Sequence, residues 1–129
     1  MTMGTPPTRA WDAAELAALD NTPLIRVAGA RPDGTLRSFV LIGHVRIGDD
    51  EIIRSLNGTG GSWYRGATRT GQGAIEVDGR RIEVAFIVDH GREDEVDHAL
   101  RARYGHGFGV RRMTKPSARE ATLRVAPLA

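Results

Sequence analysis

Residues 74–86, AIEVDGRRIEVAF, decide the fold of this chain. The Asp-Gly pair in the middle of this segment favours a two-residue type I′ turn, because both central residues of that turn need a positive φ. A hairpin closed in this way places Glu76 opposite Arg81 and Ile75 opposite Ile82. The first pair has opposite charges and the second is aliphatic, and both stabilise adjacent antiparallel strands. The segment therefore predicts an antiparallel sheet.

Other apolar runs extend this sheet. Alternation along the second strand of the hairpin predicts that Ile82, Val84, Phe86 and Val88 face inward. Four further segments have the composition of strands, at residues 24–27, 38–47, 51–55 and 122–125. The nearly continuous apolar start of 38–47 predicts a strand that is covered on both faces. The chain is therefore expected to contain about six strands.

Helical patterns flank the strands. Asp12 and Glu15 form a capping-box pattern before an amphipathic helix over 11–19. Residues 93–104 also have helical spacing. A short helix is expected over 63–69 with Ser62 as its N-cap. Residues 106–116 are expected to be irregular. An antiparallel sheet of six strands curls into a barrel or is covered by helices. We therefore predict an α+β fold: an antiparallel barrel with two flanking helices and one short helix after the third strand.

Length and composition limit the possible functions. A chain of 129 residues suits one domain, expected at 11–129 after a disordered arm over 1–10. The absence of cysteine excludes disulfides, thiolate metal sites and a cysteine nucleophile. No apolar run approaches the roughly 20 residues that cross a membrane, and the start of the chain does not resemble a signal peptide. A cytoplasmic protein without membrane contact is expected.

Charge and histidine spacing argue against two further classes. The net charge is only +2, basic and acidic residues alternate, and aromatic residues make up 5% of the chain. This is not the pattern of a nucleic-acid binder, which concentrates its basic residues on one face. The four histidines lack the spacing of metal ligands, so no metal site is predicted. Patterns for a serine nucleophile, GxSxG or SxxK, are also absent.

The best candidate site is RSLNGTGGSWYR at residues 54–65. Its glycines let the backbone approach an anion closely, and a helix that starts after Ser62 presents free N–H groups. Arg54 and Arg65 flank the turn and can add charge-assisted hydrogen bonds. The alternative is a mobile loop and a capped helix with surface arginines. Adjacent Trp63 and Tyr64 point in different directions, so that one lines a pocket or both belong to the core.

Two other features have open roles. His44 lies in a predicted strand beside Gly43, either as a polar group of a site or as a buried histidine with its hydrogen bonds satisfied. The basic run Arg111–Lys115 is either a solvated loop or a group that reaches an anionic ligand from a neighbouring subunit.

The order of motifs resembles a known family. A Trp-Asp helix start, a strand that ends in Arg-Ser, a Gly-x-Trp-Tyr-Arg turn, a hairpin, a helix that ends in Arg-Tyr-Gly and a final Ala-Thr-Leu-Arg occur in this order. This pattern resembles the bacterial family called domain of unknown function 2255. That family is in turn similar to split β-barrel proteins that bind FMN or deazaflavin, including nitroreductases and pyridoxamine-phosphate-oxidase-like proteins. The resemblance implies a six-stranded split barrel, a homodimer, and a cofactor at the subunit interface.

The resemblance also implies a function and a site. A flavin- or deazaflavin-binding oxidoreductase-like protein would act on a small organic molecule, which would be its partner. The cofactor would contact Arg54, Ser55, Gly61, Ser62, Trp63, Tyr64 and Arg65, and the candidates for a catalytic side chain are His44, Arg54 and Tyr64. Gly66–Arg69 departs from the continuation that nitroreductases use. Two alternatives therefore stay open: a cofactor-free protein that binds or transforms a small molecule in the same cavity, and a purely structural dimer.

Overall fold

The predicted hairpin is the starting point of the structure. In the computed structural model, which describes residues 5–129, its turn has φ values of 50° and 73° at the Asp-Gly pair, as a type I′ turn requires. Glu76 lies opposite Arg81, with 3.0 Å between Glu76 Oε2 and Arg81 Nη2. Ile75 lies opposite Ile82. Both predicted pairs are confirmed.

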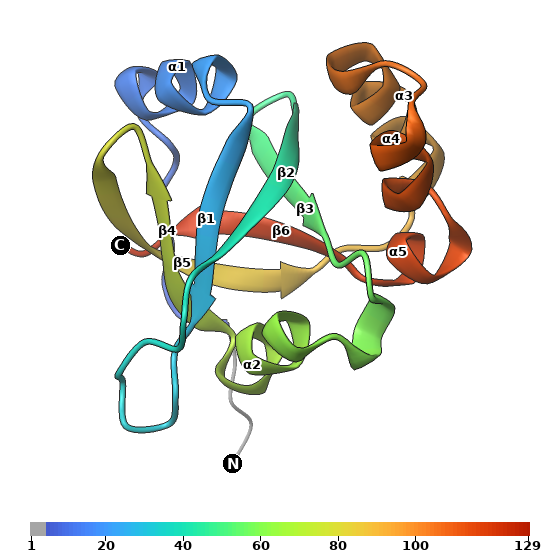
Figure 1. Ribbon diagram of the computed structural model, residues 1–129. Helices are drawn as coiled ribbons and strands as arrows, with labels where there is room; N and C mark the ends of the chain where they lie inside the picture. Colours follow the sequence, from blue (N-terminus) through green and yellow to red (C-terminus); the bar gives the residue numbers. More distant parts are fainter. Residues whose placement is uncertain (1–4) are drawn as a thin grey trace.

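Six strands close into a barrel (Figure 1). They are β1 (Leu24–Gly29), β2 (Val40–Ile47), β3 (Asp50–Arg54), β4 (Gln72–Val77), β5 (Arg80–Val88) and β6 (Thr122–Pro127). Their order around the barrel is β1-β2-β3-β6-β5-β4, and β4 also pairs with β1. All of these pairings are antiparallel. The predicted α+β fold with a six-stranded antiparallel barrel is confirmed.

Five α-helices and one 3₁₀ turn surround the barrel within residues 5–129. They are α1 (Ala13–Asn21), η1 (Gly58–Gly60), α2 (Ser62–Thr70), α3 (Glu93–Tyr104), α4 (Phe108–Met113) and α5 (Pro116–Glu120). Residues 106–116 were expected to be irregular, but α4 lies within this segment and α5 begins at its last residue. The expectation was therefore wrong. Pro116 begins α5 at a position that tolerates proline, and burial of Val110 and Ala118 holds the two short helices in place.

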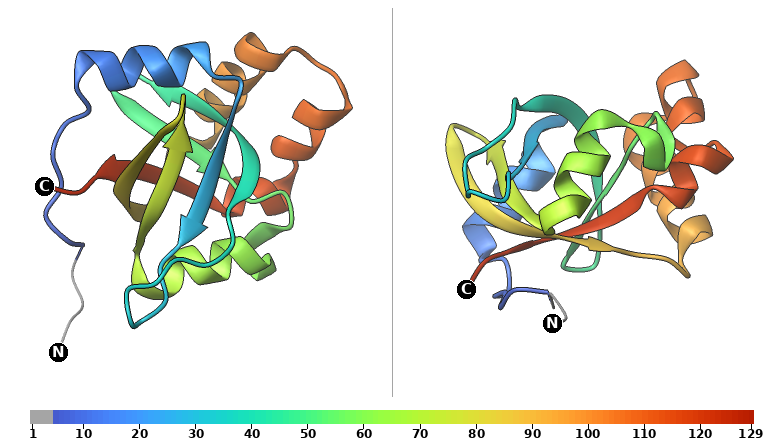
Figure 2. Two further views of the ribbon diagram at one scale, coloured as in Figure 1. Left: turned by 60° about the vertical axis from the view of Figure 1, so that its left-hand side comes forward. Right: turned by 90° about the horizontal axis from the view of Figure 1, so that it is seen from below.

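The helices occupy three positions around the barrel. Helix α1 lies across one end, α2 lies across the other, and α3 to α5 flank one side (Figures 1 and 2). On that side, Val45 and Ile52 from β2 and β3 pack against Val96, Leu100 and Val110 of the helices. A separate apolar cluster fills the barrel interior and extends to both end helices.

Two expected burials differ in the structure. Val88 was expected to face inward but is 50% exposed, because it ends β5 beyond the interior cluster. Strand β2 was expected to be covered on both faces, yet Leu41 is 53% exposed. The helices cover β2 at Val45, and Leu41 lies outside this cover.

The start of the described chain runs beside β6. Of the arm predicted over residues 1–10, residues 1–4 lie outside the described part. Arg9 N donates a hydrogen bond to Pro127 O at 2.9 Å, and Ala129 N donates to Pro7 O at 3.0 Å. The Arg9 guanidinium bonds to Glu15 at 2.8 Å and lowers the pKa of that carboxyl to about 2. Glu15 also completes the predicted capping box of α1.

Helix α2 packs on bare backbone. Gly29 at the end of β1 lies opposite Gly73 of β4. A Cβ atom at Gly29 would lie 2.6 Å from Ala67 N and 2.6 Å from the carbonyl carbon of Gly66. These are backbone atoms of a helix, which cannot move aside alone. The absence of a side chain at Gly29 therefore sets the distance between α2 and the barrel.

A buried guanidinium joins the helical side to the barrel. Arg54 at the end of β3 forms an ion pair with Asp97 of α3, and its Nε donates to Thr122 Oγ1 at 2.9 Å. It also donates to Glu93 O and Met113 O, each at 3.1 Å. Arg119 of α5 forms a second ion pair with Asp97. The Arg54 side chain thus connects β3 and β6 to α3 and α4, and Asp97 links this network to α5.

We predict that Gly29→Ala lowers the free energy of unfolding by about 2 kcal/mol, because the new methyl group meets helix backbone. Urea denaturation measures this change. Gly60→Ala is the control, because the space around a Cβ at Gly60 is open and its φ is not positive. Equal effects of the two substitutions would contradict the proposed close packing.

We predict that Asp97→Asn lowers the free energy of unfolding by about 3 kcal/mol, because it leaves the buried Arg54 cation without its counter-charge. The matched control is Asp94→Asn, since Asp94 pairs with the same Arg119 but its side chain is 97% exposed. The control should have a much smaller effect in the same denaturation experiment. A loss as large in the control as in Asp97→Asn would refute the role given to burial.

Candidate functional site

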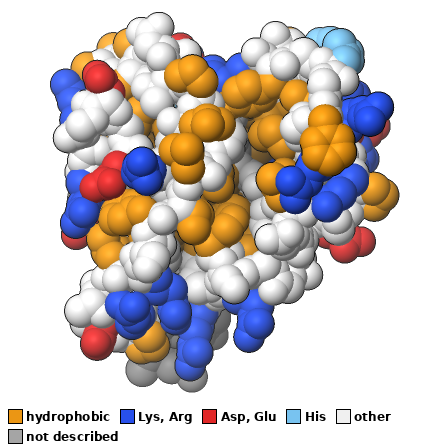
Figure 3. All heavy atoms as spheres, viewed as in Figure 1, with side chains coloured by type: hydrophobic (Ala, Val, Ile, Leu, Met, Phe, Trp, Pro, Cys, Tyr) orange, Lys and Arg blue, Asp and Glu red, His pale blue; other side chains and the backbone are white. Residues whose placement is uncertain are grey.

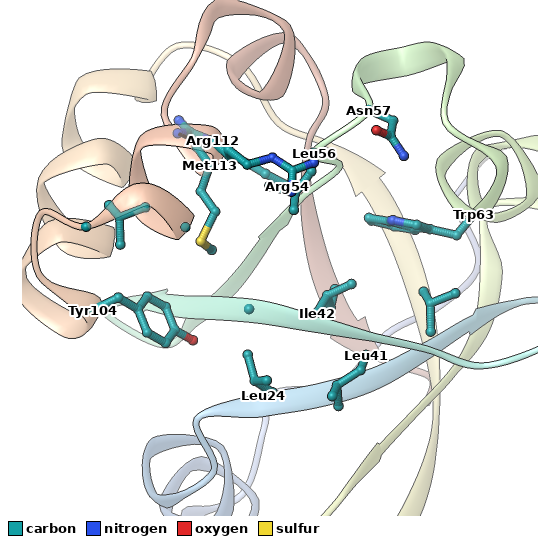
Figure 4. Close-up of a pocket in the computed structure, with 15 residues that line it drawn as sticks. Leu24, Leu41, Ile42, Arg54, Leu56, Asn57, Trp63, Tyr104, Arg112 and Met113 are labelled. Carbon is teal, nitrogen blue, oxygen red and sulfur yellow. Dashed lines mark hydrogen bonds between the residues drawn. The ribbon is translucent and has the colours of Figure 1, made fainter.

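A groove opens between β2, α4 and the turn that precedes α2. Its volume is about 480 Å³, within the range of small-molecule sites. Figure 3 shows apolar side chains along this hollow, and Figure 4 shows the lining residues. They are Leu24, Val40, Leu41, Ile42, Gly43, Arg54, Leu56, Asn57, Trp63, Tyr104, Gly107, Gly109, Val110, Arg112 and Met113. The lining combines residues from four stretches of the sequence, at 24, 40–43, 54–63 and 104–113.

The floor of the groove includes bare strand backbone at Gly43. A Cβ atom there would lie 2.6 Å from Met113 Cε and 3.6 Å from the Tyr104 hydroxyl oxygen. The thioether of Met113 therefore occupies the place beside Gly43 that a larger residue would take. Methionine is flexible and adapts to irregular space, so this part of the groove can change shape without movement of the backbone.

Aromatic rings lie at two sides of the groove (Figure 4). The Tyr104 hydroxyl is 2.6 Å from Pro23 O and 2.8 Å from His44 O, and it accepts a hydrogen bond from His44 N at 3.0 Å. These contacts fix the Tyr104 ring. Trp63 is half-buried and contacts Tyr64 edge-on, with 6.3 Å between ring centroids.

The two adjacent aromatic residues have different roles. Tyr64 belongs to the interior cluster, and burial raises the pKa of its hydroxyl. Trp63 lines the groove. The expectation was that one of these two residues lines a pocket or that both belong to the core, and Trp63 is the one that lines the groove.

Two cations line the groove, and they differ in availability. Arg54 is 3% exposed, and its guanidinium is held by Asp97, Thr122 and two carbonyl oxygens. Burial lowers the pKa of Arg54, and the neighbouring carboxylate of Asp97 opposes this effect. Arg112 is exposed and forms no ion pair within residues 5–129. Arg112 is therefore the lining residue with positive charge available to a ligand.

The glycine-rich turn lies beside the groove. Asn57 and Trp63 line the groove on either side of it, but residues 58–62 do not. Gly61, not Ser62, is the N-cap of α2, which corrects the predicted cap, and Ser62 is exposed. In the described part of the chain, the N–H groups of residues 62–64 have no hydrogen-bond acceptor. The start of α2 can therefore accept an anionic group.

Ser55 and Arg65 occupy opposite environments near this turn. Ser55 is 1% exposed, and its Oγ has no hydrogen-bond partner among the described residues. A Cβ at Gly61 would lie 2.7 Å from that oxygen, so the hydroxyl is packed against the helix start. Arg65 is exposed on α2. The predicted cofactor residues are therefore neighbours, but only Arg54 and Trp63 among them line the groove.

His44 belongs to a buried polar cluster at the α1 end of the barrel and not to the groove. Its Nε2 donates to Thr22 O at 2.6 Å, and its Nδ1 is 2.7 Å from Glu51 Oε2, although this second contact lacks hydrogen-bond alignment. Arg103 Nη2 lies 3.4 Å from Nε2. Burial raises the pKa of Glu51, and His44 opposes this rise. The cluster anchors the end of α1.

Neither a metal site nor a membrane-spanning helix is found among the described residues. No group of three histidine or acidic side chains within 5–129 is arranged to hold a metal ion. Over the same residues, no helix combines the length and the apolar character that crossing a membrane requires.

Comparison with solved structures shows relatives of the same fold. A conserved hypothetical protein from Mycobacterium tuberculosis superposes with a TM-score of 0.60 and 13% identity, over 98% of this chain and 85% of that one. An F420 reductase superposes with a TM-score of 0.57 and 20% identity, over 88% and 92%. An FAD-binding protein from Mesorhizobium loti gives 0.59 and 16%, over 95% and 94%. These likenesses establish the fold.

Comparison of sequences identifies the family. No curated protein matches the chain. A family described as uncharacterized proteins conserved in bacteria, DUF2255, matches residues 15–125. The match includes the barrel, the groove and the turn before α2. The chain therefore belongs to the DUF2255 family.

Proposed function

We propose that this protein binds a flavin-type cofactor, FMN or a deazaflavin, in the groove and acts as an oxidoreductase on a small organic molecule. The observation that carries the proposal is the composition of the groove: an apolar floor, an aromatic ring at Trp63, and an available cation at Arg112. A planar, apolar ring that carries an anionic substituent is the ligand this combination suits.

The residues present fit such a group. A ring can stack beside Trp63 on the Ile42–Gly43 floor once the Met113 side chain moves aside. The three N–H groups at the start of α2 can hold a phosphate, and Arg112 adds charge at the mouth of the groove. When bound, the cofactor supplies the hydride transfer. The chain's own part is to orient the ring and exclude water from it.

The fold comparisons support this choice of ligand. Two of the structural relatives are named as an F420 reductase and an FAD-binding protein. Neither name transfers an activity by itself, because the identities are 20% and 16%. The groove residues of this chain provide the independent reason.

A cofactor-free protein is the second candidate. The observation in its favour is that Arg54, expected to hold the phosphate, already makes four hydrogen bonds within the protein. The same groove would then bind a small, mainly apolar molecule. Titration with cofactors separates the two candidates.

We also propose that two copies associate beside the groove. Leu24 and Leu41 are 46% and 53% exposed, and both line the groove. They lie on adjacent strands and form an apolar surface that a second copy can cover.

The first prediction of this proposal concerns cofactor binding. We expect micromolar or tighter binding of FMN or of the deazaflavin F420, seen as quenching of tryptophan fluorescence and as a shift of the cofactor absorption band. Arg112→Gln should weaken binding about tenfold, because a charge-assisted contact is lost. Binding of neither cofactor by the wild-type protein would refute the proposal and favour the cofactor-free alternative.

The matched control for this experiment is Arg111→Gln. Arg111 is adjacent, exposed and of the same charge, but it does not line the groove. Its substitution should leave the affinity within about twofold, since only long-range electrostatics change. Equal weakening by both substitutions would show that Arg112 has no specific role.

The second prediction concerns assembly. Light scattering at micromolar concentration should give the mass of a dimer, and Leu41→Lys should shift it to the mass of a monomer, because a charge in an apolar interface is poorly solvated. Val88→Lys is the control, since Val88 is 50% exposed and does not line the groove. A monomeric wild-type protein would contradict the dimer proposal.

A further inference from the structure

Helix α2 carries positive charge that the protein itself does not neutralise. Arg65 and Arg69 are exposed and lie four residues apart on this helix. Arg37, from the segment before β2, lies across the same helix at Gly66. A Cβ atom at Gly66 would lie 2.7 Å from Arg37 Cδ and 2.9 Å from Arg37 Nε. We call these three residues, Arg37, Arg65 and Arg69, the α2 arginine cluster.

The α2 arginine cluster lacks counter-charge from the described residues. Six other arginines with exposed or half-buried side chains each have a carboxylate within ion-pair distance: Arg9, Arg46, Arg81, Arg92, Arg119 and Arg124. Within residues 5–129, no member of the α2 arginine cluster has such a partner, and the sequence of α2 contains no acidic residue. The protein therefore pairs many surface arginines but leaves this helix basic.

This arrangement is unfavourable for the protein alone. Like charges four residues apart destabilise a helix by about 0.2–0.5 kcal/mol. Arg37 Nε is buried and has no hydrogen-bond partner among the described residues. A buried donor without an acceptor also lowers stability. An external anion would remove the repulsion between these arginines, because it supplies the missing charge.

The cluster is continuous with the groove. Trp63, which lines the groove, lies one helical turn before Gly66, where Arg37 rests. The chain from Arg37 leads directly into Val40, which also lines the groove. Figure 3 shows basic side chains gathered below the apolar hollow, over the position of α2. A ligand in the groove can therefore extend past Trp63 onto this helix.

We infer that the α2 arginine cluster binds an anionic chain that extends from the ring-binding groove. The inference rests on the proposed function, since the ring in the groove is what brings the chain to α2. The chemistry required is at least two negative charges in sequence, from a diphosphate or from successive carboxylates. Planar guanidinium groups bind both kinds of oxyanion in a bidentate manner. A ligand that carries only one phosphate leaves part of the α2 arginine cluster without an anionic partner.

The experiment compares ligands that share a ring but differ in charge. Riboflavin, FMN and FAD carry the same ring with no phosphate, one phosphate and a diphosphate. Wild-type protein should bind FAD most tightly and riboflavin least, and higher salt should reduce this difference. The double variant Arg65→Gln/Arg69→Gln should lose about tenfold or more in affinity for FAD and keep its affinity for riboflavin. An unchanged affinity for FAD would overturn the inference.

Two probes without a ring identify the chain chemistry. Tripolyphosphate and a tetraglutamate peptide are titrated separately by calorimetry against the wild-type protein and the double variant. Binding of either probe that the double variant loses supports the cluster and identifies phosphate or carboxylate as the preferred group. Binding of neither probe by the wild-type protein overturns the inference. Binding of a probe without binding of any ring refutes the proposed function while the anion site stands.

The control is a second double variant, Arg80→Gln/Arg101→Gln. Both arginines are exposed and lie outside α2, so the change in net charge is identical. It should retain most of the affinity for FAD and for the probes. Thermal unfolding provides a further test, because removal of the repulsion within α2 should leave the double variant Arg65→Gln/Arg69→Gln at least as stable as wild type. Equal loss of affinity in the two double variants would contradict a specific site.

Discussion

The buried contact of Arg54 with Asp97 holds the two parts of this molecule together. Strands and helices also meet through apolar side chains, which set no unique orientation, and through the Tyr104 hydroxyl, which contacts the backbone of His44 in β2. The planar guanidinium has directional donors, and these reach Thr122 in the barrel, Glu93 O and Met113 O in the helices. One wall of the groove is formed by α4, so the same contact that orients the helices also determines the shape of the groove. The position that resembled a ligand contact in the sequence is therefore a structural support.

Features that depend on residues close together in the sequence were predicted correctly, whereas features that depend on contacts between distant residues were missed. The Asp-Gly hairpin was predictable to the residue, because its turn and its pairs are encoded within 13 consecutive residues. Helices α4 and α5 were missed, because glycine and arginine give no helical pattern there and the stability comes from buried Val110 and Ala118. The exposure of Leu41 could not be read from its apolar neighbours either. The exposure of Leu41 depends on how far along β2 the helices α3 and α4 extend.

The same distinction applies to the groove. Trp63 and the turn before α2 were recognised because they are contiguous in the sequence. Tyr104, Arg112 and Met113 come from a segment about 50 residues later and meet the turn only through the fold. The basic run that contains Arg112 was noted, but nothing local separates Arg112 from Arg111. Both arginines belong to the short helix α4. The rotation of this helix relative to the barrel decides that Arg112, and not Arg111, lines the groove.

The closed order of the strands has a consequence for assembly and folding. Each of the six strands has a neighbour on both sides, although Val40–Gly43 of β2 pairs with β1 alone, because β3 pairs only with His44–Ile47. Little strand backbone is therefore left for another chain to extend. Closure also requires β1 to pair with β4, across the intervening residues 30–71. Such long-range pairing is expected to make folding slow, with transient exposure of strand edges that the finished barrel conceals.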